Sequence, residues 1–215
     1  MKEGSFFFLK DSYFEKFSDT NLKLNKKTEN KHTQFRPYLY AFTDKDNPNI
    51  FWAIPMSSKT QKYRAIYQKC VQKYGRCDYL RFGRFAGRES TFVIQNMCPV
   101  TKKYISHPYN NKYGLPMDMN YTVKHEIIAS AQRTLEKTKH GIKLIFPDIQ
   151  SIYEQLEHEL KEEQNFDFYE EPKKEKNLHA VKNPIETFCK QWAQEQDNIA
   201  QFEENAENAG EDVEW

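Results

Sequence analysis

The sequence predicts an α+β domain with a curved antiparallel sheet. Short apolar runs bounded by turn residues predict five or six strands, and stretches with apolar residues at helical spacing follow mainly after them. Strands followed by helices, rather than alternating with them, are typical of this fold class. A chain of 215 residues corresponds to about one ordinary domain with room for an appendage, and it is large enough to bury a core.

The first predicted elements are a strand at Ser5–Leu9 and a small helix that begins at Asp11 or Ser12. Ser12 and Glu15 match a capping box, in which each side chain bonds the backbone N–H of the other residue. Residues 21–34 are rich in Lys and Asn and predict a long polar loop. Loops of this length are typically functional or disordered.

A β-hairpin is predicted next. Phe35–Thr43 and Ile50–Pro55 both have the composition of strands, and the Asp-Asn-Pro-Asn segment at 46–49 supplies turn residues between them. Proline has no N–H to donate to a sheet, so Pro55 is expected where the second strand ends.

The second strand of this hairpin leads into the segment around which the chain is organised. Ser57 or Ser58 is a good helix N-cap, because its hydroxyl accepts a hydrogen bond from a free backbone N–H. Apolar and aromatic residues recur at helical spacing from Lys59, and Gly75 is a natural residue to follow the helix. The unit is therefore a strand, a tight Ser-Ser turn and an amphipathic helix.

The first turn of this helix carries an unusual charge pattern. Lys59 and Lys62 lie where the positive end of the helix dipole favours acidic side chains. Cations beside free N–H groups and two hydroxyls indicate a site for an anion such as phosphate. The alternative is a solvated, lysine-rich helix start without a ligand.

The middle of the chain predicts a second pair of strands and a long helix. The strands are expected at Asp78–Phe82 and Ser90–Gln95, and Val100–His107 is expected to form a short helical turn. The helix extends from about Asn120 to His140, with Gly141 as its stop signal.

The last third predicts one more strand and two helices. Ile142–Phe146 is apolar and predicts a short strand, and Pro147 begins a helix that reaches about Leu160. Charged residues and proline at 161–182 predict a linker, and a final helix starts at about Pro184.

Composition favours a soluble, cytoplasmic protein. The mean hydropathy is −0.92 and 29% of the residues are charged. No apolar run approaches the length of a membrane span, and the N-terminal residues lack the apolar core of a signal peptide.

The charge distribution points to a polyanionic partner. Residues 194–215 hold eight of the 31 acidic residues and no Lys or Arg, so residues 1–193 carry a net charge of about +9. A basic body with an acidic tail is typical of proteins that bind nucleic acid. The tail itself is expected to be a frayed helix or a disordered segment.

Cysteine spacing and missing motifs exclude several classes of site. None of the four cysteines forms a C-x-x-C pair, which makes a disulfide framework or a zinc ribbon a poor interpretation. There is no G-x-G-x-x-G, Walker A or helix-borne H-E-x-x-H motif, so nucleotide-binding folds and zincins have no support. We expect no cofactor and no metal, with Cys98 and His107 as the one conceivable metal pair. The cysteines are Cys70, Cys77, Cys98 and Cys189.

Four segments carry a resemblance to a known family. FFFLKDSYFEKFSD, QFRPYLYAF, the PMSSK turn after its strand, and FVIQNMCPVT resemble, in this order and spacing, the ToxN/AbiQ family. These proteins are endoribonuclease toxins of type III toxin–antitoxin systems, and the chain is most similar to the CptN-like branch. The similarity covers about Phe6 to Leu160.

The resemblance implies a compact, twisted β-barrel-like core flanked by helices, similar to MazF/Kid-type toxins. It implies metal-independent cleavage of mRNA and of the precursor of the toxin's own antitoxin, in a system that defends against phage by abortive infection. The antitoxin would be a small pseudoknotted RNA that inhibits the toxin in a closed protein–RNA hetero-oligomer, without a protein antitoxin. Residues 1–163 would form the toxin domain, and 164–215 a linker, helix and acidic extension.

Metal-free RNA cleavage makes definite chemical demands. The 2′-OH loses a proton and attacks the adjacent phosphate, which gives a 2′,3′-cyclic phosphate and a 5′-OH. A base, a cation for the phosphate and an acid for the leaving oxygen are needed. The resemblance places Ser57, Ser58 and Lys59 at the active site. Ser58 is the first choice to orient the phosphate or the 2′-OH, and Lys59 would move the proton or hold the charge.

Three further residues match positions of the family's active site. Arg36 stands where other members carry a basic residue, often Lys; because Arg cannot act as a base, we assign it to transition-state stabilisation. His32 falls where a family Tyr lies and would act as acid or base near neutral pH. Tyr13 matches a family Tyr that would bond the phosphate, with an aromatic core residue as the alternative.

Other basic residues would form a surface that follows the RNA backbone, with Tyr63 or Phe85 stacking on unpaired bases and His107 bordering the groove. The alternative for each of these basic residues is a solvated position on the surface without a ligand. The basic residues are Lys62, Arg64, Arg81, Arg84, Arg88, Lys102, Lys103 and Arg133.

Two other functions remain open. A non-catalytic RNA-binding protein would keep the basic groove and lack cleavage. A MazF-like toxin would instead be held by a protein antitoxin, encoded beside it as a small acidic protein.

Overall fold

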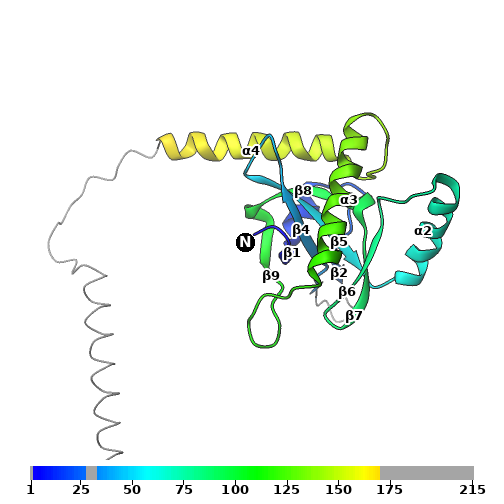
Figure 1. Ribbon diagram of the computed structural model, residues 1–215. Coiled ribbons are helices and arrows are strands. Elements are labelled where there is room, and N and C mark those ends of the chain that lie inside the picture. Colours follow the sequence, from blue (N-terminus) through cyan, green and yellow to red (C-terminus); the bar gives the residue numbers. More distant parts are fainter. Residues whose placement is uncertain (1, 28–32, 170–215) are drawn as a thin grey trace, which may run out of the picture. The chain divides into compact units, whose positions relative to one another are not determined.

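The computed structural model describes residues 2–27 and 33–169 (Figure 1). The chain divides into two compact units, 1–167 and 168–215, and the strands of the described residues all lie in the first. His32, the helix predicted from Pro184 and the acidic tail lie outside the described residues.

A seven-stranded antiparallel sheet forms the centre of the first unit, in the order β6-β7-β5-β4-β1-β9, with β8 also paired to β5. Within the described residues this sheet is not closed, because β6 and β9 are edges. Two short strands, β2 and β3, form a separate ribbon. The strands are β1 Phe6–Leu9, β2 Lys26–Lys27, β3 Thr33–Gln34, β4 Pro37–Thr43, β5 Ile50–Ser57, β6 Arg81–Phe85, β7 Arg88–Phe92, β8 Cys98–Thr101 and β9 Ile105–Pro108.

Strand β5 is the axis of the sheet. One of its edges pairs with β4, as the predicted hairpin requires. The other edge is shared, since Ile50–Ala53 pair with β8 while Met56 and Ser57 pair with β7. This division places the β6–β7 hairpin beside the end of β5 and the turn that follows it.

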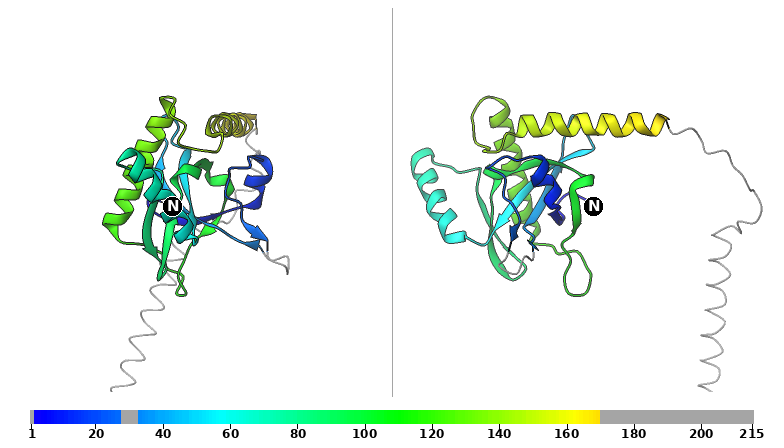
Figure 2. Two further views of the ribbon diagram at one scale, coloured as in Figure 1. Left: turned by 90° about the vertical axis from the view of Figure 1, so that its right-hand side faces the viewer. Right: turned by 180° about the vertical axis from the view of Figure 1, so that it is seen from behind.

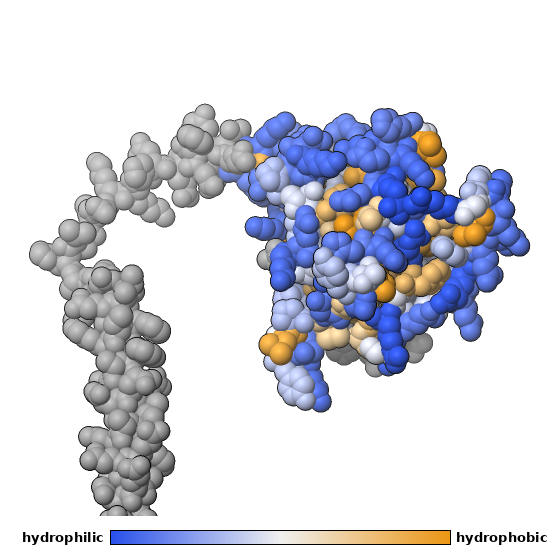
Figure 3. Space-filling view, viewed as in Figure 1, coloured by the Kyte–Doolittle hydropathy of each residue, from blue (hydrophilic) through white to orange (hydrophobic). Residues whose placement is uncertain are grey.

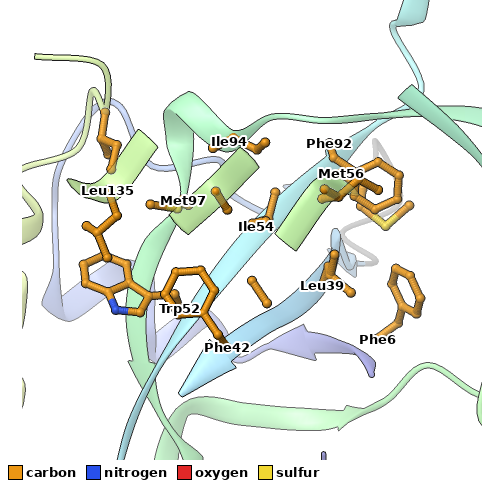
Figure 4. Close-up of a cluster of buried hydrophobic side chains, with 14 of the residues drawn as sticks. Phe6, Leu39, Phe42, Trp52, Ile54, Met56, Phe92, Ile94, Met97 and Leu135 are labelled. Carbon is orange, nitrogen blue, oxygen red and sulfur yellow. The ribbon is translucent and has the colours of Figure 1, made fainter. Parts of the chain in front are cut away.

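Both faces of β5 are buried. Trp52, Ile54 and Met56 pack in a cluster with helix α3 (Tyr121–Lys139), which Figure 4 shows. Phe51 and Ala53 point into a second cluster with α1 (Asp11–Lys16) and α4 (Ile149–Tyr169). Figure 2 shows α1 and α3 on opposite sides of the strands. Burial on both faces explains why the strand is apolar throughout instead of alternating.

Helix α2 (Thr60–Tyr74) lies to the side of the sheet, next to β6 and β7 (Figures 1 and 2). It has its own small core, in which Tyr63 and Cys70 pack against Leu80 and Val93. Gly75 ends the helix with φ +70°, as predicted, because glycine adopts this left-handed conformation without steric cost.

Pro55 is not the end of β5, which continues to Ser57. The carbonyl oxygen of Pro55 accepts a hydrogen bond from the N–H of Val93 at 3.0 Å. Because the nitrogen and the carbonyl oxygen of one strand residue face the same neighbouring strand, the Pro55 nitrogen, which has no hydrogen, faces this edge of β5 too. There it lies between the residues that pair with β8 and those that pair with β7. The missing donor is tolerated because no ladder bond is needed at this point.

Two of the predicted helix caps are wrong. Helix α1 begins at Asp11 after Lys10, and α2 begins after Lys59; neither of these two N-cap residues makes a side-chain cap. The expected boundary of α3 is confirmed, because the side chain of Asn120 accepts from the N–H of Val123 at 3.2 Å.

Other elements differ from the prediction as well. The strands expected at Asp78–Phe82 and Ser90–Gln95 are observed at Arg81–Phe85 and Arg88–Phe92. Val100–His107 is not a helical turn but the end of β8, one turn of 3₁₀ helix at Lys102–Tyr104 and most of β9. Ile142–Phe146 is not a strand. Helix α4 continues past Leu160 to Tyr169, through the first residues of the predicted linker. No helix in the described part of the chain has the length and apolar character to cross a membrane.

Candidate active site

A pocket of about 300 Å³ lies where β4 begins, β5 ends and the β6–β7 hairpin turns. Five residues predicted for catalysis or RNA binding line it together: Arg36, Ser57, Ser58, Phe85 and Arg88. Its full lining is Phe35, Arg36, Pro37, Met56, Ser57, Ser58, Phe85, Ala86, Arg88, Glu89, Ser90 and Tyr109.

Arg36 is held in the pocket by its own hydrogen bonds. Its Nη1 donates to the carbonyl oxygen of Met56 at 2.7 Å, and its Nε donates to that of Leu24 at 3.2 Å. Its backbone N–H donates to Oδ1 of Asn25 at 2.9 Å. The two side-chain bonds occupy two of the five N–H donors of a guanidinium and fix its orientation. A pre-oriented guanidinium is suited to a phosphate group.

The Ser-Ser turn lines the same pocket as Arg36. The half-buried Ser57 accepts a hydrogen bond from the N–H of Lys59 at 3.2 Å, which stabilises the turn between β5 and α2. Ser58 and Lys59 are exposed, as is Lys62 one turn further on. The first turn of α2 contains no acidic residue. The predicted anion site therefore has hydroxyls, cations and the helix N-terminus in one place, and its ligand stays a prediction.

Aromatic side chains form another wall of the pocket. Phe85 and Tyr109 line it with ring centroids 5.3 Å apart, and Phe35 lines it from the start of β4. Phe85 is nearly buried, so Phe35 and Tyr109 offer the accessible faces. His107 does not line the pocket but packs on Phe35, with ring centroids 5.5 Å apart. Aromatic faces beside cations are suited to an unpaired nucleobase.

Lys23, which no sequence pattern selects, does not line the pocket, but the fold brings it close enough to Arg36 for the two charges to interact. Its carbonyl oxygen accepts a hydrogen bond from the hydroxyl of Tyr38 at 2.6 Å, and the residue is half-buried. Burial, followed by the positive charges of Arg36 and Lys62, lowers the pKa of the Lys23 ammonium from its ordinary value. Lys23 is one of several lysines in the polar loop, and only the folded chain sets it apart.

Tyr13 does not lie in the pocket. It is fully buried, and its hydroxyl donates to the carbonyl oxygen of Pro99 at 2.8 Å. Burial, above all, raises the pKa of this phenol well above its ordinary value. The prediction of a phosphate contact is wrong for this residue, and the alternative of an aromatic core residue is the one observed.

The structure also changes the prediction for the two residues expected to stack on bases. Tyr63 is 9% exposed and packs in the small core under α2, so its ring is not available to a base. Phe85 lines the pocket but is only 5% exposed, because it also packs on Phe6 with ring centroids 4.1 Å apart.

Several predicted RNA-binding residues are engaged with acidic groups. Arg64 pairs with Glu89 and lies 4.7 Å from the ring centroid of Phe82. Lys103 pairs with Glu163 at 2.9 Å, on α4. Each of these pairs neutralises a charge that was predicted to contact RNA.

Arg81 and Arg133 both pair with the buried carboxylate of Asp78, each at 3.2 Å. They lie on β6 and α3, not at the pocket. Arg84 and Lys102 are exposed, and Arg84 lines a shallow hollow of about 420 Å³ on the β6–β7 hairpin together with Arg64.

The last candidate from the sequence is a metal site. No three His, Cys, Asp or Glu side chains in the described residues are grouped so that they would hold a metal ion. Cys98 is fully buried, and this burial raises the pKa of its thiol to about 12. Cys70, Cys77 and Cys98 are free and buried thiols.

Comparison with known proteins identifies no family for the chain. No protein-family model matches the sequence, and no curated protein matches it. The pocket and its residues therefore carry the functional argument.

Proposed function

We propose that the chain is a metal-independent, sequence-specific endoribonuclease toxin of a type III toxin–antitoxin system, acting in the cytoplasm. The observation that supports this proposal is the pocket in which Arg36, Ser57 and Ser58 meet beside aromatic faces. These residues come from two segments of the chain, and their types match the needs of phosphate recognition. The antitoxin would be a small pseudoknotted RNA, bound in a closed protein–RNA assembly.

In this proposal the pocket holds the phosphate that is cleaved. Arg36 binds its non-bridging oxygens, and the hydroxyl of Ser58 orients the phosphate or the attacking 2′-OH. We assign the base that takes the proton of the 2′-OH, as the bond from O2′ to phosphorus forms, to Lys23, because Arg36 acts on its charge and its pKa is lowered. The bond from phosphorus to O5′ then breaks, and Lys59 gives the leaving oxygen a proton. The products are a 2′,3′-cyclic phosphate and a 5′-OH.

The proposal includes the barrel-like core of MazF/Kid-type toxins. The sharing of one β5 edge between β7 and β8 supports it, because a change of partner along one strand allows a sheet to bend at that point. The pocket lies at the end of β5 where this division occurs.

The experiment is incubation of the purified full chain with a mixed RNA pool in excess EDTA, followed by sequencing of the RNA ends and analysis of their chemistry. Discrete cuts with 2′,3′-cyclic phosphates are expected. Ser58→Ala should remove them, whereas Ser12→Ala, at an exposed serine of α1, should leave them unchanged. Intact RNA that the protein retains in a salt-sensitive manner would favour the non-catalytic RNA-binding protein.

A second measurement addresses the antitoxin. The protein is co-expressed with the DNA that flanks its gene and purified under native conditions. A co-purifying RNA of uniform repeat length supports the type III assignment. A co-purifying small acidic protein would instead assign the chain to the MazF-like class with a protein antitoxin.

A further inference from the structure

A second and larger pocket lies at the other end of α2. Its volume is about 720 Å³, and it lies between the C-terminal end of α2, the segment 76–79 and the segment 142–146 that comes after α3. We call it the α2–α3 pocket. Helix α2 has 15 residues. Because an α-helix rises about 1.5 Å per residue, this pocket is roughly 20 Å from the turn at Ser58.

Large apolar side chains are open to solvent in this pocket. Tyr74 is 66% exposed, Ile142 54% and Phe146 45%. Figure 3 shows hydrophobic residues between α2 and α3, among other hydrophobic residues on this face. Three exposed residues of this size around one cavity indicate a binding surface, since apolar residues on a free surface are normally scattered.

The walls of the pocket are fixed by backbone hydrogen bonds through Gln95. Its N–H donates to the carbonyl oxygen of Tyr79 at 3.0 Å, and its carbonyl oxygen accepts from the N–H of Phe146 at 2.8 Å. One residue thereby joins the segment after α2 to the segment after α3. The pocket is pre-formed, which reduces the entropic cost of binding a ligand.

The pocket has an excess of positive charge. The carboxylate of Asp78, 2% exposed, is surrounded by four cationic side chains at 2.9–3.2 Å. Two of the four, Arg76 and Lys137, line the pocket together with Asp78. Lys143 adds an exposed cation, so the lining holds three positive charges and one negative charge. The four are Arg76, Arg81, Arg133 and Lys137.

We propose that the α2–α3 pocket binds an unpaired nucleotide of an RNA strand, with the base against Tyr74 and Phe146 and the phosphate near Arg76 and Lys143. This inference rests on the proposed function for the identity of the polymer. Open aromatic faces suit the base, the surplus cations suit the phosphate, and the side-chain amide of Gln95 offers a donor and an acceptor to a base edge.

An acidic peptide is the other polymer that cations attract. It has no need for flat aromatic faces, and its carboxylates would meet the buried carboxylate of Asp78 at the same place. The nucleotide accounts for both the aromatic and the cationic parts of the lining. The α2–α3 pocket would then be a second RNA-binding site, away from the scissile phosphate.

The test uses the double variant Tyr74→Ala/Lys143→Ala, in the full chain. Both side chains are exposed, so the fold should be preserved. The matched control is Tyr113→Ala/Lys112→Ala, which removes the same two residue types at positions that line neither pocket. In the control site the ammonium of Lys112 lies 4.8 Å from the ring centroid of Tyr113, and the ring is 75% exposed.

Binding of a labelled single-stranded RNA is measured by fluorescence anisotropy in EDTA, with Ser58→Ala in all variants to prevent cleavage. We expect the dissociation constant to rise about tenfold in the double variant, as loss of one stacked base and one phosphate contact implies. The slope of log affinity against log salt should fall by about one. The control should bind like the parent. With Ser58 restored, the double variant should cleave a dinucleotide at the normal rate, because this substrate occupies only the first pocket.

The other outcomes separate the two proposals. Equal RNA affinity in the double variant and its control would overturn the second site while leaving the nuclease intact. If the parent binds RNA through the α2–α3 pocket but cleaves no substrate, the second site stands and the nuclease fails. Tight binding of a free mononucleotide or of a glutamate-rich peptide that the double variant loses, with RNA affinity unchanged, would also overturn the inference.

Discussion

Nη1 of Arg36 donates a hydrogen bond to the carbonyl oxygen of Met56 across 2.7 Å, which joins the residue before β4 to the penultimate residue of β5. The bond fixes the guanidinium at the end of the strand that leads to Ser57 and Ser58. Under the proposed function, the side chain assigned to transition-state stabilisation is thereby held in place before the substrate arrives.

Replacing Arg36 tests this arrangement. Arg36→Ala should lower the cleavage rate by about 10²- to 10³-fold, the usual effect of removing one electrostatic stabiliser. Arg36→Lys keeps the charge but cannot make both backbone bonds and present a fork to the phosphate, so we expect a loss of about 10²-fold. The measurements are single-turnover cleavage and denaturant unfolding. Full activity of Arg36→Lys would show that charge alone is sufficient and that the fork has no role.

Lys23 is expected to be the base, and its variants distinguish a base from a simple cation. Because an arginine keeps the charge but does not deprotonate, Lys23→Arg should lose cleavage about as severely as Lys23→Gln. The pKa of Lys23 is lowered by burial and by Arg36 and Lys62, so the rate of the parent should rise with pH until this lysine is neutral. The rising limb should disappear in both variants. Cleavage by Lys23→Arg at the rate of the parent would contradict the role of Lys23 as a base.

The long periodic segments could be predicted from the sequence, because their signal is local. Ile50–Pro55 is apolar throughout and was predicted as a strand, and a glycine was predicted to end the next helix; the structure has both features, with the strand two residues longer. By contrast, β8 pairs with β5 and β9 with β1, far away in the sequence. Short strands of this kind owe their conformation to a distant partner. In the apolar Ile142–Phe146 segment, Phe146 donates a backbone hydrogen bond to Gln95, but the segment forms no strand ladder and is not a strand.

The same distinction applies to the candidate site. Arg36 and the Ser-Ser turn were predicted from their residue types and from the family resemblance, and the structure places them in one pocket. The sequence around Tyr13 would be the same whether its side chain faced a ligand or the core. Only its burial in the folded chain shows that it belongs to the core. Lys23 and the α2–α3 pocket depend on contacts between distant segments, so they are visible only in the folded chain.

Asp78 should stabilise the fold in a pH-dependent manner. Burial alone would raise the pKa of its carboxyl group, but hydrogen bonds from Arg76, Lys137 and Arg133 outweigh burial and lower it below the ordinary value of 3.8. A carboxyl group with a lowered folded-state pKa stabilises the protein above the unfolded-state pKa. This stabilisation is then lost as the pH falls below about 4 and through the folded-state pKa. Asp78→Asn should therefore lower the free energy of unfolding at neutral pH, by about 3 kcal/mol for a broken buried ion pair.

The matched control is Asp118→Asn. Asp118 also pairs with a lysine, Lys124, at 2.7 Å, but its side chain is 66% exposed. Exposed pairs contribute less than about 1 kcal/mol, so this variant should unfold almost like the parent. Urea unfolding at neutral pH and near pH 3 measures both. The difference between Asp78→Asn and the parent should shrink at the lower pH; an unchanged difference would mean that the charge of Asp78 is not what stabilises the fold.

Tyr13→Phe should affect stability and leave catalysis unchanged. The hydroxyl of Tyr13 is buried and donates to the carbonyl oxygen of Pro99 at 2.8 Å, so its removal leaves a buried acceptor without this donor. We expect a loss of about 1–2 kcal/mol in the free energy of unfolding and, for a chain of this size, a fall in Tm of about 2–8 °C.

Tyr109→Ala should have the opposite effect, because Tyr109 lines the candidate active site and is only partly buried. Loss of a stacking face should weaken RNA binding by about tenfold or more, with a smaller change in Tm than a core substitution gives. Thermal unfolding, RNA binding by fluorescence anisotropy and single-turnover cleavage are measured on both variants. If Tyr13→Phe lowers the cleavage rate of the fully folded protein, the hydroxyl reaches the substrate in a conformation other than this one. If it lowers only Tm, Tyr13 belongs to the core, and the phosphate is left to Arg36 and the Ser-Ser turn.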